Sequence, residues 1–141
     1  MVRRQHEETR IQPATVVVIN YDGREHLEEC LQSIQEADGP IQDVILVDDA
    51  STDGSVAFVQ DQFPWVRVIR LAENQGPAAA RNAGIESAAT PWVCLLDNDI
   101  VVDKGWLIAL VQAMAENRDA AVCSSRILVY ERPGIIGGDG N

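Results

Sequence analysis

WVCLLDND, residues 92–99, is an apolar run that ends in two carboxylates one residue apart. Its first five residues, 92–96, are typical of a buried strand, because such a run places apolar side chains on both faces. Carboxylates are costly to bury, so we expect Asp97 and Asp99 at the exit of this strand. Ligands bind at the carboxyl edge of a parallel sheet. Two hard oxygen donors there suit Mg²⁺ or Mn²⁺, with a phosphate as a further ligand.

Strand and helix patterns alternate along the chain on both sides of this stretch. Apolar runs predict strands at 15–20, 44–47 and 66–71, besides 92–96, with further strand-like segments at 120–122 and 127–130. The residues that recur at helical spacing, or follow a helix-starting proline, are Leu27, Leu31 and Ile34; Val56, Val59 and Phe63; Pro77 to about Ser87; and Trp106, Leu107, Leu110, Val111 and Met114. This order predicts an α/β fold with a Rossmann-like, mostly parallel sheet and helices on both faces.

The same pass along the chain predicts one domain. Residues 13–141 carry the alternating pattern, and residues 1–12 read as a disordered leader because they are charged and have no apolar core. The tail 134–141 is rich in glycine and is expected to hold no closing element, so the domain is expected to be incomplete on its C-terminal side.

Composition narrows the class of protein. Hydrophobic residues make up 46% of the chain, and 22 acidic against 11 basic residues give a net charge of -11, which argues against nucleic-acid binding. The three cysteines show no metal-ligand spacing, so we expect free thiols in a reducing compartment, with Cys94 in the core. No apolar stretch is long enough to span a membrane. We expect a cytoplasmic protein, either free or peripheral at the inner face of the membrane.

Polar clusters follow three of the predicted strands. They are Asn20-Tyr21-Asp22, Asp48-Asp49 and Asp97-Asn98-Asp99. Asp and Asn are common after strands because they make turns and cap helices, and this structural reading is preferred for Asp22 as a turn residue and for Ser51 and Asp53 as caps. It fails for Asp97, because the next helix does not begin until about Gly105. We therefore expect the Asp97/Asp99 pair to bind a ligand.

A polar pair interrupts the small-residue helix that follows Pro77. The alanines and Gly76 permit close packing on the sheet, whereas Arg81 and Asn82 have no such explanation. Arg81 has two alternatives that the sequence leaves open. One is an ion pair with an aspartate at a strand end, and the other is direct contact with an anionic ligand.

Four segments together resemble the inverting family 2 glycosyltransferases of the GT-A fold. They are VVVINY (16–21), ILVDDASTDGS (45–55), NQGPAAARNAGI (74–85) and LLDND (95–99), in the family's order and at its spacing. The resemblance covers the chain from about Thr15 to Leu107. It implies a transfer of sugar from a UDP-, GDP- or dTDP-sugar to an acceptor hydroxyl, with inversion at the anomeric carbon.

The resemblance also assigns residues. Asp99, with Asp97, would hold Mg²⁺ or Mn²⁺ on the donor's phosphates. The residues implied to bind the nucleotide-sugar are Ile19, Asn20, Tyr21, Asp49, Arg81, Asp97 and Asn98. The family's acceptor-activating base lies well downstream, and Asp103 and Asp139 do not match its motif. The resemblance thus implies that residues 13–141 form the donor-binding part, that the base lies beyond Asn141, and that this chain binds donor weakly without transferring sugar.

Two other classes of protein remain as alternatives. A non-catalytic module that self-associates as a homo-oligomer, or binds a partner, would cover the apolar surface that an incomplete sheet exposes. Another α/β enzyme is the second alternative. No G-x-G-x-x-G follows the first strand, which disfavours a dinucleotide-dependent oxidoreductase. A phosphatase would place its D-x-D after an early strand with Thr or Val two residues on; here the motif follows strand four, although Val101 does fit.

Overall fold

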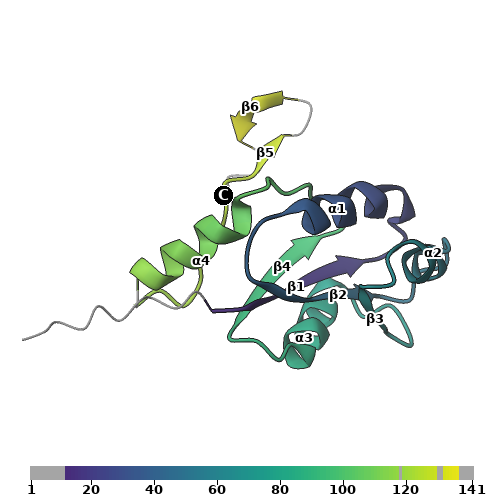
Figure 1. Ribbon diagram of the computed structural model, residues 1–141. Helices are drawn as coiled ribbons and strands as arrows, with labels where there is room; N and C mark the ends of the chain where they lie inside the picture. The colour runs from purple at the N-terminus through teal and green to yellow at the C-terminus, as the bar shows by residue number, and fades with distance from the viewer. Residues whose placement is uncertain (1–11, 118, 130–131, 137–141) are drawn as a thin grey trace, which may run out of the picture.

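A four-stranded parallel sheet forms the centre of the molecule, seen in a computed structural model that describes residues 12–117, 119–129 and 132–136. Its strand order is β3-β2-β1-β4, and neighbouring strands run parallel throughout (Figure 1). The strands are β1 (Ala14–Asn20), β2 (Ile41–Asp48), β3 (Arg67–Arg70) and β4 (Trp92–Asp97). Apart from Gln12, the expected leader lies outside the described residues.

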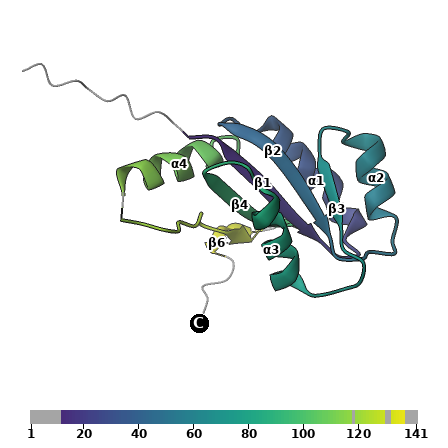
Figure 2. The same cartoon turned by 90° about the horizontal axis from the view of Figure 1, so that it is seen from below.

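Helices cover both faces of this sheet, as the sequence predicts. They are α1 (Arg24–Glu36), α2 (Ser55–Gln62), α3 (Pro77–Ser87) and α4 (Trp106–Glu116). Apolar residues of α1, α2 and α4 share one core cluster with the sheet, while α3 packs on the opposite face (Figure 1, Figure 2). The predicted α/β class is therefore confirmed.

Alternation along β1 builds these two cores. Val16 and Val18 belong to the cluster on the α1 side, and Val17 belongs to the cluster on the α3 side. Helix α3 approaches very closely at Gly84, where an added Cβ would lie 2.3 Å from Cγ1 of Val17. Only glycine fits this contact without displacing the helix or the buried valine.

Strand β4 differs from its prediction as a buried strand. It lies at the edge of the described sheet, and Leu95 on it is 41% exposed. Along one edge β4 pairs with β1, and no described strand pairs with its other edge. An apolar sequence shows that a strand can be buried, but it does not show how many neighbours the strand has in the sheet. The prediction of full burial was therefore wrong for β4.

The segment after α4 also departs from expectation. Residues 120–122 are not a strand, and Val122 is 83% exposed, because no described strand lies beside this segment to pair with it. A two-stranded antiparallel sheet follows instead, with β5 (Leu128–Val129) and β6 (Arg132–Ile136). Residues 134–136 of the tail belong to β6, which pairs with β5 and does not join the main sheet, so the described part of the tail holds no closing element. Residues 137–141 lie outside the described part. Across the described residues, no helix has the length and hydropathy that crossing a membrane requires.

All three cysteines are free thiols in different surroundings. Cys30 is 1% exposed, and its burial, together with the charge of Asp99, raises the pKa of its thiol to about 12. Cys94, which is half-buried against the core, has a pKa raised to about 11 by burial and by Cys123. Cys123 is exposed.

We expect native protein at pH 8 to react rapidly with a thiol reagent at Cys123 only. The thiolate is the reactive form, and the raised pKa values of about 12 for Cys30 and about 11 for Cys94 leave very little thiolate at pH 8. Absorbance titration with an aromatic disulfide should therefore count one fast equivalent in native protein and three after denaturation. Rapid modification of Cys30 in the folded chain would contradict the burial described.

Candidate functional site

The polar residues at the strand ends line one hollow of about 420 Å³ at the carboxyl edge of the sheet. All eight residues that the sequence assigns to the site lie in its wall. These are Ile19, Asn20, Tyr21, Asp49, Arg81, Asp97, Asn98 and Asp99. Strands β1, β2 and β4 end side by side, so three segments distant in sequence meet here. The hollow has the size and position expected of a ligand site in an α/β fold.

The three carboxylates in the wall differ in what they contact. Asp97 forms an ion pair with Arg81, with 2.6 Å between Oδ1 and Nη2. Asp49 is 3% exposed and accepts the backbone N–H groups of Gln75 and Gly76, each at 2.8 Å. Among the described residues, no hydrogen bond or ion pair engages the carboxylate of Asp99. Asp99 is therefore the carboxylate with both oxygens available to a ligand.

Arg81 thus forms an ion pair with an aspartate at a strand end, the first of the two alternatives that the sequence leaves open. Its guanidinium lies on α3 and reaches across to the end of β4. Both side chains are partly exposed, at 36% for Arg81 and 51% for Asp97, so the pair stands in contact with solvent. An ion pair of this kind contributes little to stability, and its guanidinium can also turn to an anion in the hollow.

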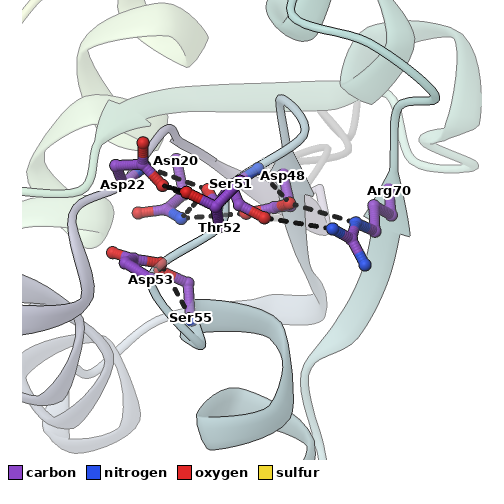
Figure 3. A network of polar contacts seen from close by, with 8 residues as sticks. All are labelled: Asn20, Asp22, Asp48, Ser51, Thr52, Asp53, Ser55 and Arg70. Carbon is purple, nitrogen blue, oxygen red and sulfur yellow. Dashed lines mark hydrogen bonds and ion pairs between the residues drawn. The ribbon is translucent and has the colours of Figure 1, made fainter.

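A buried polar network supports the wall from below (Figure 3). Asp48 has no exposed surface, and its carboxylate accepts the Asn20 side-chain amide at 3.0 Å and the Ser51 N–H at 3.0 Å. Arg70 lies at the rim of the network, where Nε is 3.8 Å from Asp48 and Nη2 donates to the Ser51 carbonyl. Because buried polar groups are costly when unpaired, this network holds the ends of β1 and β2 in one arrangement.

Ser51 does not cap the following helix, contrary to its prediction. Its hydroxyl accepts instead the Asn20 amide at 3.1 Å and the Asp22 N–H at 2.9 Å (Figure 3). The helix begins later, so Ser51 lies too far from its free N–H groups. Asp53 does act at the helix start, where its carboxylate accepts the N–H of Ser55. Asp22 is a turn residue, with φ of 46° and a bond from the Thr52 N–H.

Asp53 also shows the effect of such bonds on titration. Partial burial alone would raise its pKa, but hydrogen bonds from the Ser55 hydroxyl and from the N–H groups of Arg24 and Ser55 outweigh this and lower the pKa. The Asp53 carboxylate therefore stays ionised to lower pH than an ordinary aspartate.

Asn98 is the central residue of the D-x-D stretch and is fitted between β1 and the start of α1. Its Nδ2 donates to Oδ1 of Asn20 at 2.7 Å. A Cβ at Gly23 would lie 1.7 Å from the same nitrogen, so this approach depends on glycine. The middle residue is thus tied to the sheet, while Asp97 and Asp99 on either side reach different surroundings.

The hollow is also lined by four residues that were not predicted from the sequence to belong to the site. They are Asn74, Gly76, Pro77 and Ala80. Asn74 follows β3 at the same edge of the sheet, so the rule that found the other three polar clusters would also have found it. The other three lie at the start of α3, where Pro77 was predicted to begin the helix and Gly76 and Ala80 to permit close packing.

The charges in the wall bear on whether a divalent cation fits. Three carboxylates face one guanidinium, so the hollow is negative and would repel a phosphate-bearing ligand by itself. The described residues hold no group of three His, Cys, Asp or Glu placed to bind a metal. Asp99 with at most one further carboxylate therefore fits a Mg²⁺-like ion that takes its remaining ligands from phosphate and water.

Comparisons with known proteins show the family to which this chain belongs. The sequence model described as glycosyl transferase family 2 matches residues 15–138. Succinoglycan biosynthesis protein ExoO of Rhizobium meliloti is 36% identical over 115 residues, which cover 79% of this chain and 31% of that protein. Glycosyltransferase GlyG of Streptococcus pneumoniae is 32% identical over 121 residues, which cover 83% of this chain and 40% of that protein. The chain thus spans well under half the length of these relatives.

Solved structures give the same result for the fold. S. aureus TarS in complex with UDP superposes with a TM-score of 0.68 and 27% identity, covering 75% of this chain and 33% of that chain. The mannosyltransferase PcManGT from Pyrobaculum calidifontis, in complex with GDP-Man and Mn²⁺, gives 0.67 and 28%, covering 82% and 36%. These likenesses confirm the expected GT-A fold. With the family model matching nearly the whole described sheet and its helices, the chain belongs to glycosyl transferase family 2.

Proposed function

We propose that residues 13–141 form the nucleotide-sugar-binding portion of a glycosyltransferase, with Asp99 as the principal protein ligand of a Mg²⁺ or Mn²⁺ ion. One observation carries this proposal. Of the three carboxylates in the hollow, Asp99 alone lacks a hydrogen-bond or ion-pair partner among the described residues. A carboxylate kept free at a negative site, beside a space for phosphates, fits a divalent cation.

The other wall residues would bind the rest of the donor. Tyr21 is 54% exposed at the rim, where its ring offers a flat surface to a base. Ile19, Asn20, Asp49 and Asn98 line the interior beside it. The Arg81 guanidinium can turn from Asp97 to a phosphate of the donor. The Asp97 carboxylate would then turn to the ribose or to the ion. The bound UDP, UDP-GlcNAc and GDP-Man of the structural neighbours support a donor of this class.

The reaction would be an inverting substitution at the anomeric carbon. The bond from that carbon to the nucleoside diphosphate breaks, a bond to the acceptor oxygen forms on the opposite face, and the acceptor's proton passes to a base. When bound, the divalent ion supplies stabilisation of the charge that develops on the departing diphosphate. Asp49 and Asp97 are engaged with other groups, so neither is proposed as the base.

We also propose a cytoplasmic location for this protein and prefer a glycosyltransferase to the other classes of enzyme. Three free thiols fit the expected cytoplasmic location, whether free or at the inner face of the membrane. Family membership leaves the oxidoreductase and phosphatase alternatives without support. The open edge of β4, with Leu95 exposed, favours self-association as a second property of this chain rather than a replacement for donor binding.

Titration calorimetry of the 141-residue chain tests the proposal. We expect UDP, GDP or dTDP to bind at least about tenfold more tightly with Mn²⁺ than with a chelator, because the ion offsets the negative wall. Pyrophosphate with Mn²⁺ is the control and should bind more weakly, since it lacks the base and ribose. Equal binding of nucleotide and pyrophosphate, or no effect of the metal, would refute the proposal. Size-exclusion chromatography of the same sample reports self-association.

A further inference from the structure

The loop between β4 and α4 carries Asp99 and is held by hydrogen bonds on both sides of this residue. Since the Asp99 side chain has no described partner of its own, the path of the loop backbone sets the region that its carboxylate can reach. At the start of the loop, Asn98 is bonded to Asn20, and the Ile100 N–H donates to the Asp97 carbonyl at 3.3 Å. The question is what fixes the other end.

Helix α1 supplies that second attachment through Ser33. The Val102 N–H donates to Oγ of Ser33 at 3.1 Å, across 69 residues of sequence. The Ser33 hydroxyl in turn donates to the Cys30 carbonyl at 2.8 Å, one turn earlier on the same helix. The Val102 N–H can only donate, so the Ser33 hydroxyl accepts from it through a lone pair while its own hydrogen is directed to the Cys30 carbonyl.

The hydrogen bond between Val102 and Ser33 lies in a partly buried environment. Val102 is half-buried against the α1-side core, where an N–H without an acceptor is unfavourable. One turn away, Cys30 lies beneath the start of the loop, with Sγ 4.0 Å from the Asp97 carbonyl. Cys30 and Ser33 are three residues apart on one helical face and therefore contact the loop at residues 97 and 102, on either side of Asp99.

We propose that Ser33 is a positioning residue of the metal site. It does not touch the hollow, and it acts by fixing the loop so that the Asp99 carboxylate is in place before the ion and the donor bind. This inference rests on the proposed function of the site. A ligand group that is already held in place gives tighter binding than one that must be ordered on binding, and the net worth of one such hydrogen bond is about fivefold in affinity.

Three variants of the chain test this inference, with Mn²⁺-dependent nucleotide binding as the first readout. We expect Ser33→Ala to weaken it about fivefold and Ser33→Thr, which keeps the hydroxyl, to restore it. Gln32→Ala, an exposed neighbour on the same helix, is the matched control and should bind as the parent does. Nucleotide binding with a chelator should be the same in all three variants, because the other wall residues are held independently of Ser33.

Amide hydrogen exchange of Val102, followed by NMR, is a second readout that needs no ligand. Exchange should accelerate about fivefold or more in Ser33→Ala and stay at the parent rate in Ser33→Thr. The inference is overturned if Val102 exchange is unchanged, if threonine fails to rescue, or if chelator-insensitive binding falls as much as metal-dependent binding. A parent chain that shows no metal effect, with Val102 exchange still dependent on Ser33, refutes the proposed function instead.

Discussion

Replacing Asp99 by asparagine should remove the metal-dependent component of nucleotide binding. The change keeps the shape of the side chain and eliminates the charge that, in the described structure, is not offset by any ion pair. Loss of a direct ligand exceeds the effect of losing a supporting residue, so we expect the affinity in Mn²⁺ to fall to the value measured with a chelator, a drop of at least about tenfold. Calorimetry with and without Mn²⁺ measures the difference directly.

The matched control for this variant is Asp103→Asn. Asp103 is an exposed carboxylate four residues further along and is not part of the wall of the hollow. It removes the same charge from the same connection while leaving the site intact, so binding should stay within about twofold of the parent, as expected for a screened surface charge. If both variants lost binding equally, general charge rather than coordination would explain the effect. Retained binding in Asp99→Asn would contradict the assignment.

Asp48→Asn should be the most destabilising conservative change at this edge of the sheet. The two carboxylate oxygens accept N–H donors from Asn20 and Ser51, and an amide offers only one oxygen. One donor would then face an NH₂ group in a fully buried setting, and the ion pair with Arg70 would be lost. We expect the free energy of unfolding to fall by about 3 kcal/mol. Urea denaturation followed by circular dichroism gives the value.

Asp43→Asn is the comparison for this second variant. Asp43 lies on the same strand and pairs with Arg67 at 2.7 Å, but both side chains are partly exposed. A solvent-screened pair contributes under about 1 kcal/mol, so this variant should unfold close to the parent midpoint. Equal losses in the two variants would show that burial of Asp48 does not determine its contribution.

Much of the fold follows from the period of the apolar residues. The helical spacing of Leu27, Leu31 and Ile34 predicts α1, and all three are buried in it. The short β-branched runs predict β1 and β2 because such residues pack well on a sheet. The position of the site follows as well, because parallel strands bring their carboxyl ends to one edge wherever the strands come from in the sequence.

What the sequence did not predict depends on neighbours across the chain. Residues 120–122 have strand-like side chains and no described strand beside them, so local pattern alone cannot decide their state. The bonds of Ser51 and Ser33 join residues far apart in sequence, and a lone serine has no spacing that would mark such a partner. The local tendency of serine to cap a helix was overridden at position 51 by a tertiary bond.

The contact between Gly84 and Val17 couples the dimensions of the hollow to the interior of the protein. Helix α3 supplies Pro77, Ala80 and Arg81 to the wall, and the height of this helix above the sheet is set by the absence of a side chain at position 84. A larger residue there would lift the helix and draw the guanidinium away from Asp97. Changing Gly84 and Val17 together is therefore a way to alter the width of the hollow, and so which ligands fit in it, without changing any residue that lines it.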